Sequence, residues 1–108
     1  MSVRYAVRWT DTAEADLEAI IGFIAEESLD TARHILERLR KKAINLKNIP
    51  ERGRLVPEFK AHGIVIYREL ILTPWRSIYR ITGKTVYVLA VLDSRRNLED
   101  ILLDRFVD

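Results

Sequence analysis

The sequence predicts an α+β fold in which an antiparallel β-sheet packs against an α-helical hairpin. Three observations predict it: an alternating apolar segment near the start, two amphipathic helical patterns joined by a short link, and a second half rich in strand-forming residues. With 108 residues, 48% of them hydrophobic, the chain is long enough to bury one core and too short for two domains. We therefore expect a single domain over residues 1–108, with the element order β-α-α-β-β-β-α.

A strand and a first helix are expected at the start of the chain. Every second position of residues 3–9 is apolar, which is the period of a strand with one buried face. These positions are Val3, Tyr5, Val7 and Trp9. Asp11 followed by Glu14 is a variant of the capping box, and apolar residues at helical spacing then carry the first helix to about Glu27.

A second helix is expected after a short link. Ser28 or Asp30 is its candidate N-cap, and Pro50 lies just beyond its end. Its apolar stripe consists of Ala32, Ile35, Leu36, Leu39, Ala43 and Leu46. Two amphipathic helices joined so closely form an antiparallel hairpin. We expect this hairpin to cover one face of the sheet and to leave the other face free for function.

Three meandering strands are expected in the second half. Residues 51–62 contain glycine, proline and charged residues without periodicity, and we interpret them as a loop. Strands are predicted over residues 64–72, 75–81 and 85–92, where apolar, β-branched and aromatic residues dominate. Thr82-Gly83-Lys84 has the composition of a tight hairpin turn between the last two strands.

A short helix is expected to end the fold. Asn97 is its candidate N-cap, and its apolar stripe consists of Leu98, Ile101, Leu102 and Phe106. This stripe would either pack on the sheet or dock a partner.

Charge is distributed unevenly, although the formal net charge is only +2. Residues 1–32 carry two basic and seven acidic groups, and residues 97–108 carry one basic and four acidic groups. Residues 33–47 carry six basic groups and one acidic group, and residues 48–96 carry nine basic and four acidic groups. A basic middle of the chain indicates a negatively charged partner, either nucleic acid or an acidic protein surface. The alternative for residues 33–47 is a solvated basic helix face.

Several kinds of chemistry lack the residues that they need. The chain has no cysteine, which excludes disulfides, thiolate metal sites and a cysteine nucleophile. It shows no phosphate-binding glycine loop and no metal-ligand cluster, so we expect neither a cofactor nor a metal. His34 and His62 are both expected at the surface. No leader peptide and no membrane-spanning apolar run are evident, and the expected compartment is the cytoplasm.

Residues that carry a family resemblance are spread over nearly the whole chain. In order they are Ala13-Glu14-Ala15-Asp16-Leu17, Ile20, Phe23-Ile24-Ala25, Ala32, Leu39, Pro50, Gly53, Pro57-Glu58, Tyr67-Arg68-Glu69-Leu70, Trp75-Arg76-Ser77-Ile78-Tyr79-Arg80-Ile81, Val86-Tyr87-Val88-Leu89-Ala90-Val91 and Arg95-Arg96. In this order and spacing the chain resembles the RelE/ParE superfamily of bacterial type II toxins. The resemblance implies a sheet-plus-hairpin fold and a cognate antitoxin, ParD-like or RelB-like. Operator DNA would be bound only through that antitoxin.

The superfamily has two branches that differ in chemistry. RelE-like members cut messenger RNA on the ribosome with basic residues on the central strands and a tyrosine or histidine near the C-terminus, whereas ParE-like members poison DNA gyrase. Arg76 matches the strand arginine that both branches share, and Arg68 replaces one of the RelE lysines. Leu70 stands at the second lysine position, and Asp93 stands where many relatives have histidine. The resemblance therefore implies the ParE-like branch.

A ribosome-dependent messenger RNA endonuclease is the alternative. Cleavage needs a base for the 2′-hydroxyl, an acid for the leaving oxygen and a cation to stabilise the developing charge. Glu69 and Arg76 are the candidate base and stabiliser, but the acid has no candidate because arginine holds its proton too tightly. A simple cross-strand pair between Glu69 and an arginine is the structural alternative. A third hypothesis is an inert relative that only binds its partner.

Exposed cations and aromatic rings are the candidate binding residues for the target or the antitoxin. The candidates are Arg68, Arg76, Arg80, Arg95, Arg96, Trp9 and Phe106. Arg76, Arg80, Arg95 and Arg96 would form one basic surface if the last two strands are neighbours. The arginine fork binds phosphates and carboxylates alike, and an antitoxin segment in a groove beside the hairpin would need apolar anchors. The alternatives are that the arginines pair with the protein's own acids and that the aromatic rings lie in the core.

Overall fold

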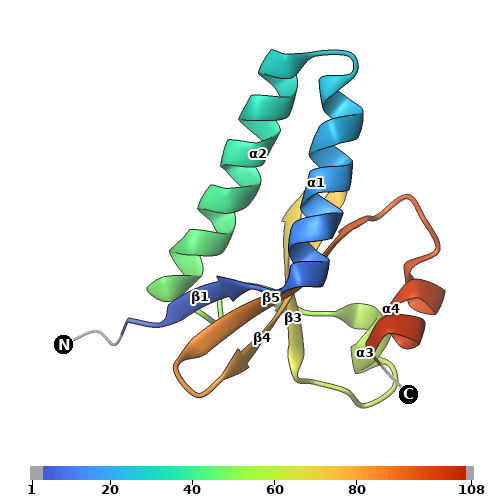
Figure 1. Ribbon diagram of the computed structural model, residues 1–108. Coiled ribbons are helices and arrows are strands. Elements are labelled where there is room, and N and C mark those ends of the chain that lie inside the picture. The colour runs from blue at the N-terminus through green and yellow to red at the C-terminus, as the bar shows by residue number, and fades with distance from the viewer. Residues whose placement is uncertain (1–3, 107–108) are drawn as a thin grey trace.

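The computed structural model describes residues 4–106 and has one five-stranded sheet with a helical hairpin on one face (Figure 1). The elements are β1 (Ala6–Trp9), α1 (Asp11–Ala25), α2 (Leu29–Ile44), the 3-10 turn η1 (Asn45–Lys47), β2 (Arg54–Leu55), α3 (Pro57–Lys60), β3 (Tyr67–Leu72), β4 (Trp75–Thr82), β5 (Thr85–Asp93) and α4 (Leu98–Phe106). The α+β class and the order of the longer elements are confirmed. Val3, where the predicted first strand begins, lies outside the described residues.

Side-chain caps fix the starts of the two hairpin helices. Thr10, and not Asp11, is the N-cap of α1, because its Oγ1 accepts a hydrogen bond from the backbone N of Ala13 at 3.1 Å. The Thr10 hydroxyl also donates to the carbonyl of Val88 at 3.2 Å, which joins the start of α1 to β5. Ser28 is the N-cap of α2, so the first of its two candidates is confirmed.

The sheet has the strand order β1-β5-β4-β3-β2. β3, β4 and β5 form the predicted antiparallel meander, with Gly83 at φ 60° in the turn between β4 and β5. β1 differs from the prediction because it pairs in parallel with β5, in the register Val7 to Val86 and Trp9 to Val88. A parallel pair needs a long connection, and most of the chain lies between these two strands.

Part of the second face of the sheet is covered, and for this part the prediction that it is free is wrong. Phe59 of α3 and Leu102 of α4 are fully buried against Ile78 and Ala90 of the sheet. Figure 1 shows α3 and α4 together at the end of the molecule opposite the helical hairpin. The ring of Phe106 completes this cluster, 5.9 Å from Phe59 between ring centroids. The C-terminal stripe therefore packs on the sheet.

The segment at residues 51–62, interpreted above as a loop, contains β2 and α3. The two elements have two and four residues, which is too short for any hydrophobic period to be visible in the sequence. Pro57 stands in the first turn of α3, where its missing N–H costs no hydrogen bond. No helix among the described residues has the length and apolar content to cross a membrane.

Candidate functional site

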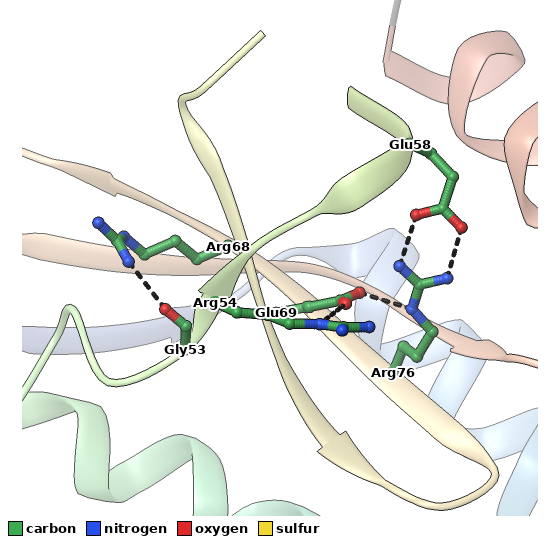
Figure 2. A network of polar contacts seen from close by, with 6 residues as sticks. All are labelled: Gly53, Arg54, Glu58, Arg68, Glu69 and Arg76. Carbon is green, nitrogen blue, oxygen red and sulfur yellow. Dashed lines mark hydrogen bonds and ion pairs between the residues drawn. The ribbon is translucent and has the colours of Figure 1, made fainter. Parts of the chain in front are cut away.

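A network of four charged side chains lies on the face of the sheet that α3 and α4 cover. Arg76 on β4 donates from Nε to Glu69 Oε1 on β3 at 2.6 Å, and from both Nη atoms to Glu58 on α3 at 2.7 Å. Arg54 on β2 donates from Nε to the second oxygen of Glu69 at 2.6 Å. Figure 2 shows Glu69 between the two arginines, with Glu58 on the outer side of Arg76. We call these four residues the arginine–glutamate network.

Hydrogen bonds favour the ionised forms of Arg76 and Glu58 in this network. The Glu69 side chain is 0% exposed and that of Arg76 is 7% exposed. Hydrogen bonds from Arg76 lower the pKa of Glu58, and hydrogen bonds to Glu58 and Glu69 raise the pKa of Arg76 despite its burial. Both oxygens of Glu69 already accept from arginines, so no exposed oxygen is left to take a proton from a substrate. The geometry is that of the cross-strand pair.

The ionisation of Glu58 makes the free energy of unfolding depend on pH in the acid range. Its folded-state pKa is lowered, so its contribution to the free energy of unfolding is complete above the ordinary glutamate pKa of about 4.3. That contribution is lost as pH falls through the lower folded-state pKa, because the unfolded chain then binds the proton more tightly. We expect Glu58→Gln to reduce the loss of stability as the pH falls below the ordinary glutamate pKa of about 4.3, as measured by urea unfolding.

Glu18→Gln is the matched control for this titration. Glu18 is an exposed carboxylate on α1 and forms no ion pair among the described residues. A Glu18→Gln variant should keep the wild-type acid dependence. Equal slopes for wild type and Glu58→Gln would contradict the assignment to Glu58.

A second buried cluster holds the segment before β2. The hydroxyl of Tyr79 donates to the carbonyl of Pro50 at 2.7 Å and accepts from the backbone N of Gly53 at 2.8 Å. Arg68 donates to the carbonyl of Gly53 at 2.8 Å. Tyr79 is 1% exposed, and this burial raises the pKa of its phenol. Arg68, predicted as a binding residue, thus also has a local structural partner.

The predicted arginines do not form one surface. Arg76 is buried and paired, whereas Arg80, Arg95 and Arg96 are exposed. Arg80 lies opposite Tyr87, six positions along β5 from Asp93, and this separation is about 20 Å at the rise of a strand. Arg95 pairs with Asp93 at 2.6 Å, and its hydrogen bonds lower the pKa of Asp93 to about 2. A binding role for the three exposed arginines stays a prediction.

A groove runs beside the hairpin between β1 and α2, and Trp9 lies in it. The groove has a volume of about 600 Å³ and is lined by Val7, Trp9, Leu36, Glu37, Arg40, Lys41 and Ile44. The Arg40 guanidinium lies 4.5 Å from the ring centroid of Trp9 and forms a two-fold ion pair with Glu14 at 2.7 and 2.8 Å. Phe106 lies elsewhere, as the last residue of α4, half-buried against Phe59 and Tyr67. We call this feature the hairpin groove.

The sequence identifies some residues of these two buried clusters and not others. Arg76 and Glu69 were identified by residue type, but Arg54 and Glu58 were missed because they lie in the segment interpreted as a loop. Tyr79 was placed only as a strand residue, and no local signal connects it with Gly53.

His34 and His62 are both exposed, as predicted. Within residues 4–106, no three histidine or carboxylate side chains gather closely enough to hold a metal ion.

The described residues form a meander sheet that carries a helical hairpin, with a partly apolar groove at the edge of the sheet. The model of the family described as "ParE toxin of type II toxin-antitoxin system, parDE" matches residues 7–98. The chain belongs to this family and is the toxin component of a type II toxin–antitoxin module, as the resemblance implied. Its partner is a cognate antitoxin.

Two solved structures are similar in fold. One is the chromosomal ParDE toxin–antitoxin system from P. aeruginosa, with a TM-score of 0.67 and 22% identity over 85% of this chain and 98% of that chain. The other is the RelBE2 toxin–antitoxin complex from Mycobacterium tuberculosis, with a TM-score of 0.59 and 25% identity over 84% of this chain and 92% of that chain. No curated protein sequence matches the chain significantly.

Proposed function

We propose that this toxin acts in the cytoplasm by inhibiting DNA gyrase, without catalysing a reaction of its own. The observation that carries the proposal is that the arginine–glutamate network leaves no carboxylate oxygen of Glu69 free to act as the general base of RNA cleavage. Glu69 is the candidate general base, and it is fully buried with both oxygens bound by arginines. The family match to ParE toxins also supports inhibition by binding rather than RNA cleavage.

We further propose that the antitoxin binds in the hairpin groove. β1 is at the edge of the sheet, where a strand or an extended segment can add. Ile44 is 46% exposed at the groove, beside Trp9 and Leu36. Apolar anchors with a charged rim at Glu37 and Arg40 favour an amphipathic antitoxin segment.

A supercoiling assay with purified DNA gyrase tests the first proposal. The toxin should block supercoiling of relaxed plasmid, and the antitoxin from the adjacent reading frame should restore it. A ribosome-dependent translation reaction run in parallel would show whether messenger RNA stays intact. Codon-phased cleavage with normal gyrase activity would replace the proposal by the endonuclease alternative. No effect in either assay, from protein verified as folded, would leave only the partner-binding role.

The groove proposal predicts a selective loss of antitoxin binding. Ile44→Asp should weaken binding at least about tenfold, because it puts a charge where an apolar anchor is buried in the complex. Phe23→Asp is the matched control, since Phe23 is 76% exposed on α1 and does not line the groove. Calorimetric titration of both variants with the antitoxin makes the comparison. Equal affinities for the two variants would move the antitoxin site elsewhere.

A further inference from the structure

A pocket lined mainly by cations lies between α2 and the segment before β2. It has a volume of about 340 Å³, and its lining residues are Arg38, Lys41, Lys42, Asn45, Arg52 and Leu70. Four of the six are basic and none is acidic. We call it the basic pocket. The sequence already marked residues 33–47 as strongly basic, and a solvated helix face was the alternative there.

Helical spacing places most of these cations side by side. Arg38, Lys41, Lys42 and Asn45 stand at positions i, i+3, i+4 and i+7 of the helix and its end, so they share one face. The helix dipole stabilises cations in this last turn. That effect explains lysines at the end of α2, but it does not explain why a cation from another segment joins them.

Arg52 is that additional cation, and its position is fixed by its neighbour. Gly53 is buried and held between the hydroxyl of Tyr79 and the guanidinium of Arg68. The Arg52 backbone N also donates to the carbonyl of Ile49 at 3.2 Å. The backbone that carries Arg52 is therefore held against β3 and β4, so little backbone conformational entropy is lost when the pocket binds a ligand.

The cations of the basic pocket are available for a ligand. Within residues 4–106, Arg38, Lys41, Lys42 and Arg52 form no ion pair, whereas Arg40, Arg54, Arg68, Arg76, Arg95 and Arg105 each have a carboxylate partner. All four are exposed. Such a concentration of unpaired positive charge attracts a ligand that carries several negative charges close together.

We propose that the basic pocket binds the phosphodiester backbone of a nucleic acid. Interfaces with proteins have apolar cores that are poor in lysine, but the pocket contains two lysines, and its one apolar residue, Leu70, is only 8% exposed. Interfaces with nucleic acids are more polar and far more positive. Phosphate contacts are not sequence-specific, so the pocket would position the toxin on a nucleic acid at its target. This inference goes beyond gyrase inhibition and is measured without gyrase.

Binding of fluorescent oligonucleotides to the full chain tests the proposal. Anisotropy titrations would use duplex DNA, single-stranded DNA and RNA, from about 20 to about 200 mM salt, with a polyglutamate peptide as a competing polyanion. If all four cations contact phosphates, log K for duplex DNA should fall with log salt at a slope between about −3 and −4. The oligonucleotide that binds most tightly identifies which kind of nucleic acid the pocket prefers.

Single substitutions localise the binding. At about 0.1 M salt, Lys42→Gln and Arg52→Gln should each weaken binding about eightfold and reduce the slope by about 0.9. Lys60→Gln is the matched control, because Lys60 is exposed on α3, on the opposite face of the sheet. All three substitutions replace exposed side chains, and circular dichroism checks that the fold is intact.

Three results would overturn the inference. They are no saturable binding to any oligonucleotide at low salt, an equal loss in Lys60→Gln, and stronger binding to polyglutamate that the same pocket variants abolish. The last result would assign the pocket to an acidic protein segment instead. None of them bears on the supercoiling assay, so the gyrase proposal stands or fails separately.

Discussion

Gly53→Ala is expected to lower the free energy of unfolding by about 3 kcal/mol, as overpacking of a rigid site does. A Cβ at this position would lie 2.5 Å from the carbonyl oxygen of Glu69 and 2.7 Å from both Cε1 and the hydroxyl oxygen of Tyr79. These neighbours cannot move apart easily, because one is the backbone of β3 and the other is a buried ring bonded to Pro50. Urea unfolding followed by circular dichroism measures the change.

Gly22→Ala is the control for this substitution, and its effect should have the opposite sign. Gly22 lies within α1, and a Cβ added there would meet nothing within 4 Å. Replacing a helical glycine by alanine should raise the free energy of unfolding by about 0.5–1 kcal/mol. A Gly53→Ala variant as stable as wild type would show that the segment before β2 can move away from Tyr79. The fixed position of Arg52 would then be in doubt as well.

Glu69→Ala should cost about 3 kcal/mol or more, because it removes the shared partner of two arginines from a buried site. Arg76 would keep Glu58, but its Nε would lose its acceptor, in a site where the Arg76 side chain of the wild-type protein is only 7% exposed. The same substitution would detach Arg54 and so loosen β2 from β3. The measurement is again urea unfolding, at neutral pH.

Arg54→Gln separates the buried half of the network from its exposed half. The Arg54 side chain is 59% exposed, so its ion pair with Glu69 is screened by water and should contribute less than about 1 kcal/mol. Similar losses in Arg54→Gln and Glu69→Ala would contradict the central place given to Glu69 and Arg76. These magnitudes also explain why loss of toxicity in a Glu69 or Arg76 variant would not by itself identify a nuclease, because such variants are expected to unfold more easily.

The periodic spacing of hydrophobic residues was sufficient to predict the longer helices and strands. α1, α2 and the meander each repeat their pattern over several turns or residue pairs, and Ser28 gave the start of α2 correctly. The parallel pairing of β1 was not predictable in this way, because a period of two marks a strand but does not identify its neighbour. Elements as short as β2 and α3 show no period at all.

The candidate site was predictable by residue type but not by contact. Arg76 and Glu69 were recognised as a candidate pair, yet whether Arg76 faces solvent depends on Glu58, which lies 18 positions away in a segment without periodicity. Gly53 signalled a turn, but the reason for a glycine there is the ring of Tyr79, 26 positions later. Contacts of this kind depend on tertiary packing, which no local pattern encodes.

The pairing of β1 with β5 sets a time order for the synthesis of this toxin. Residues 6–9 find their sheet partners only at residues 85–88, and the Thr10 hydroxyl bonds to Val88. The first strand must therefore wait until most of the chain has been made, and contacts so distant in sequence form slowly. An interrupted chain that stops before β5 would lack the strand that holds β1, and with it one wall of the hairpin groove. The hairpin groove, proposed above as the antitoxin site, is therefore complete only after β5 has been made.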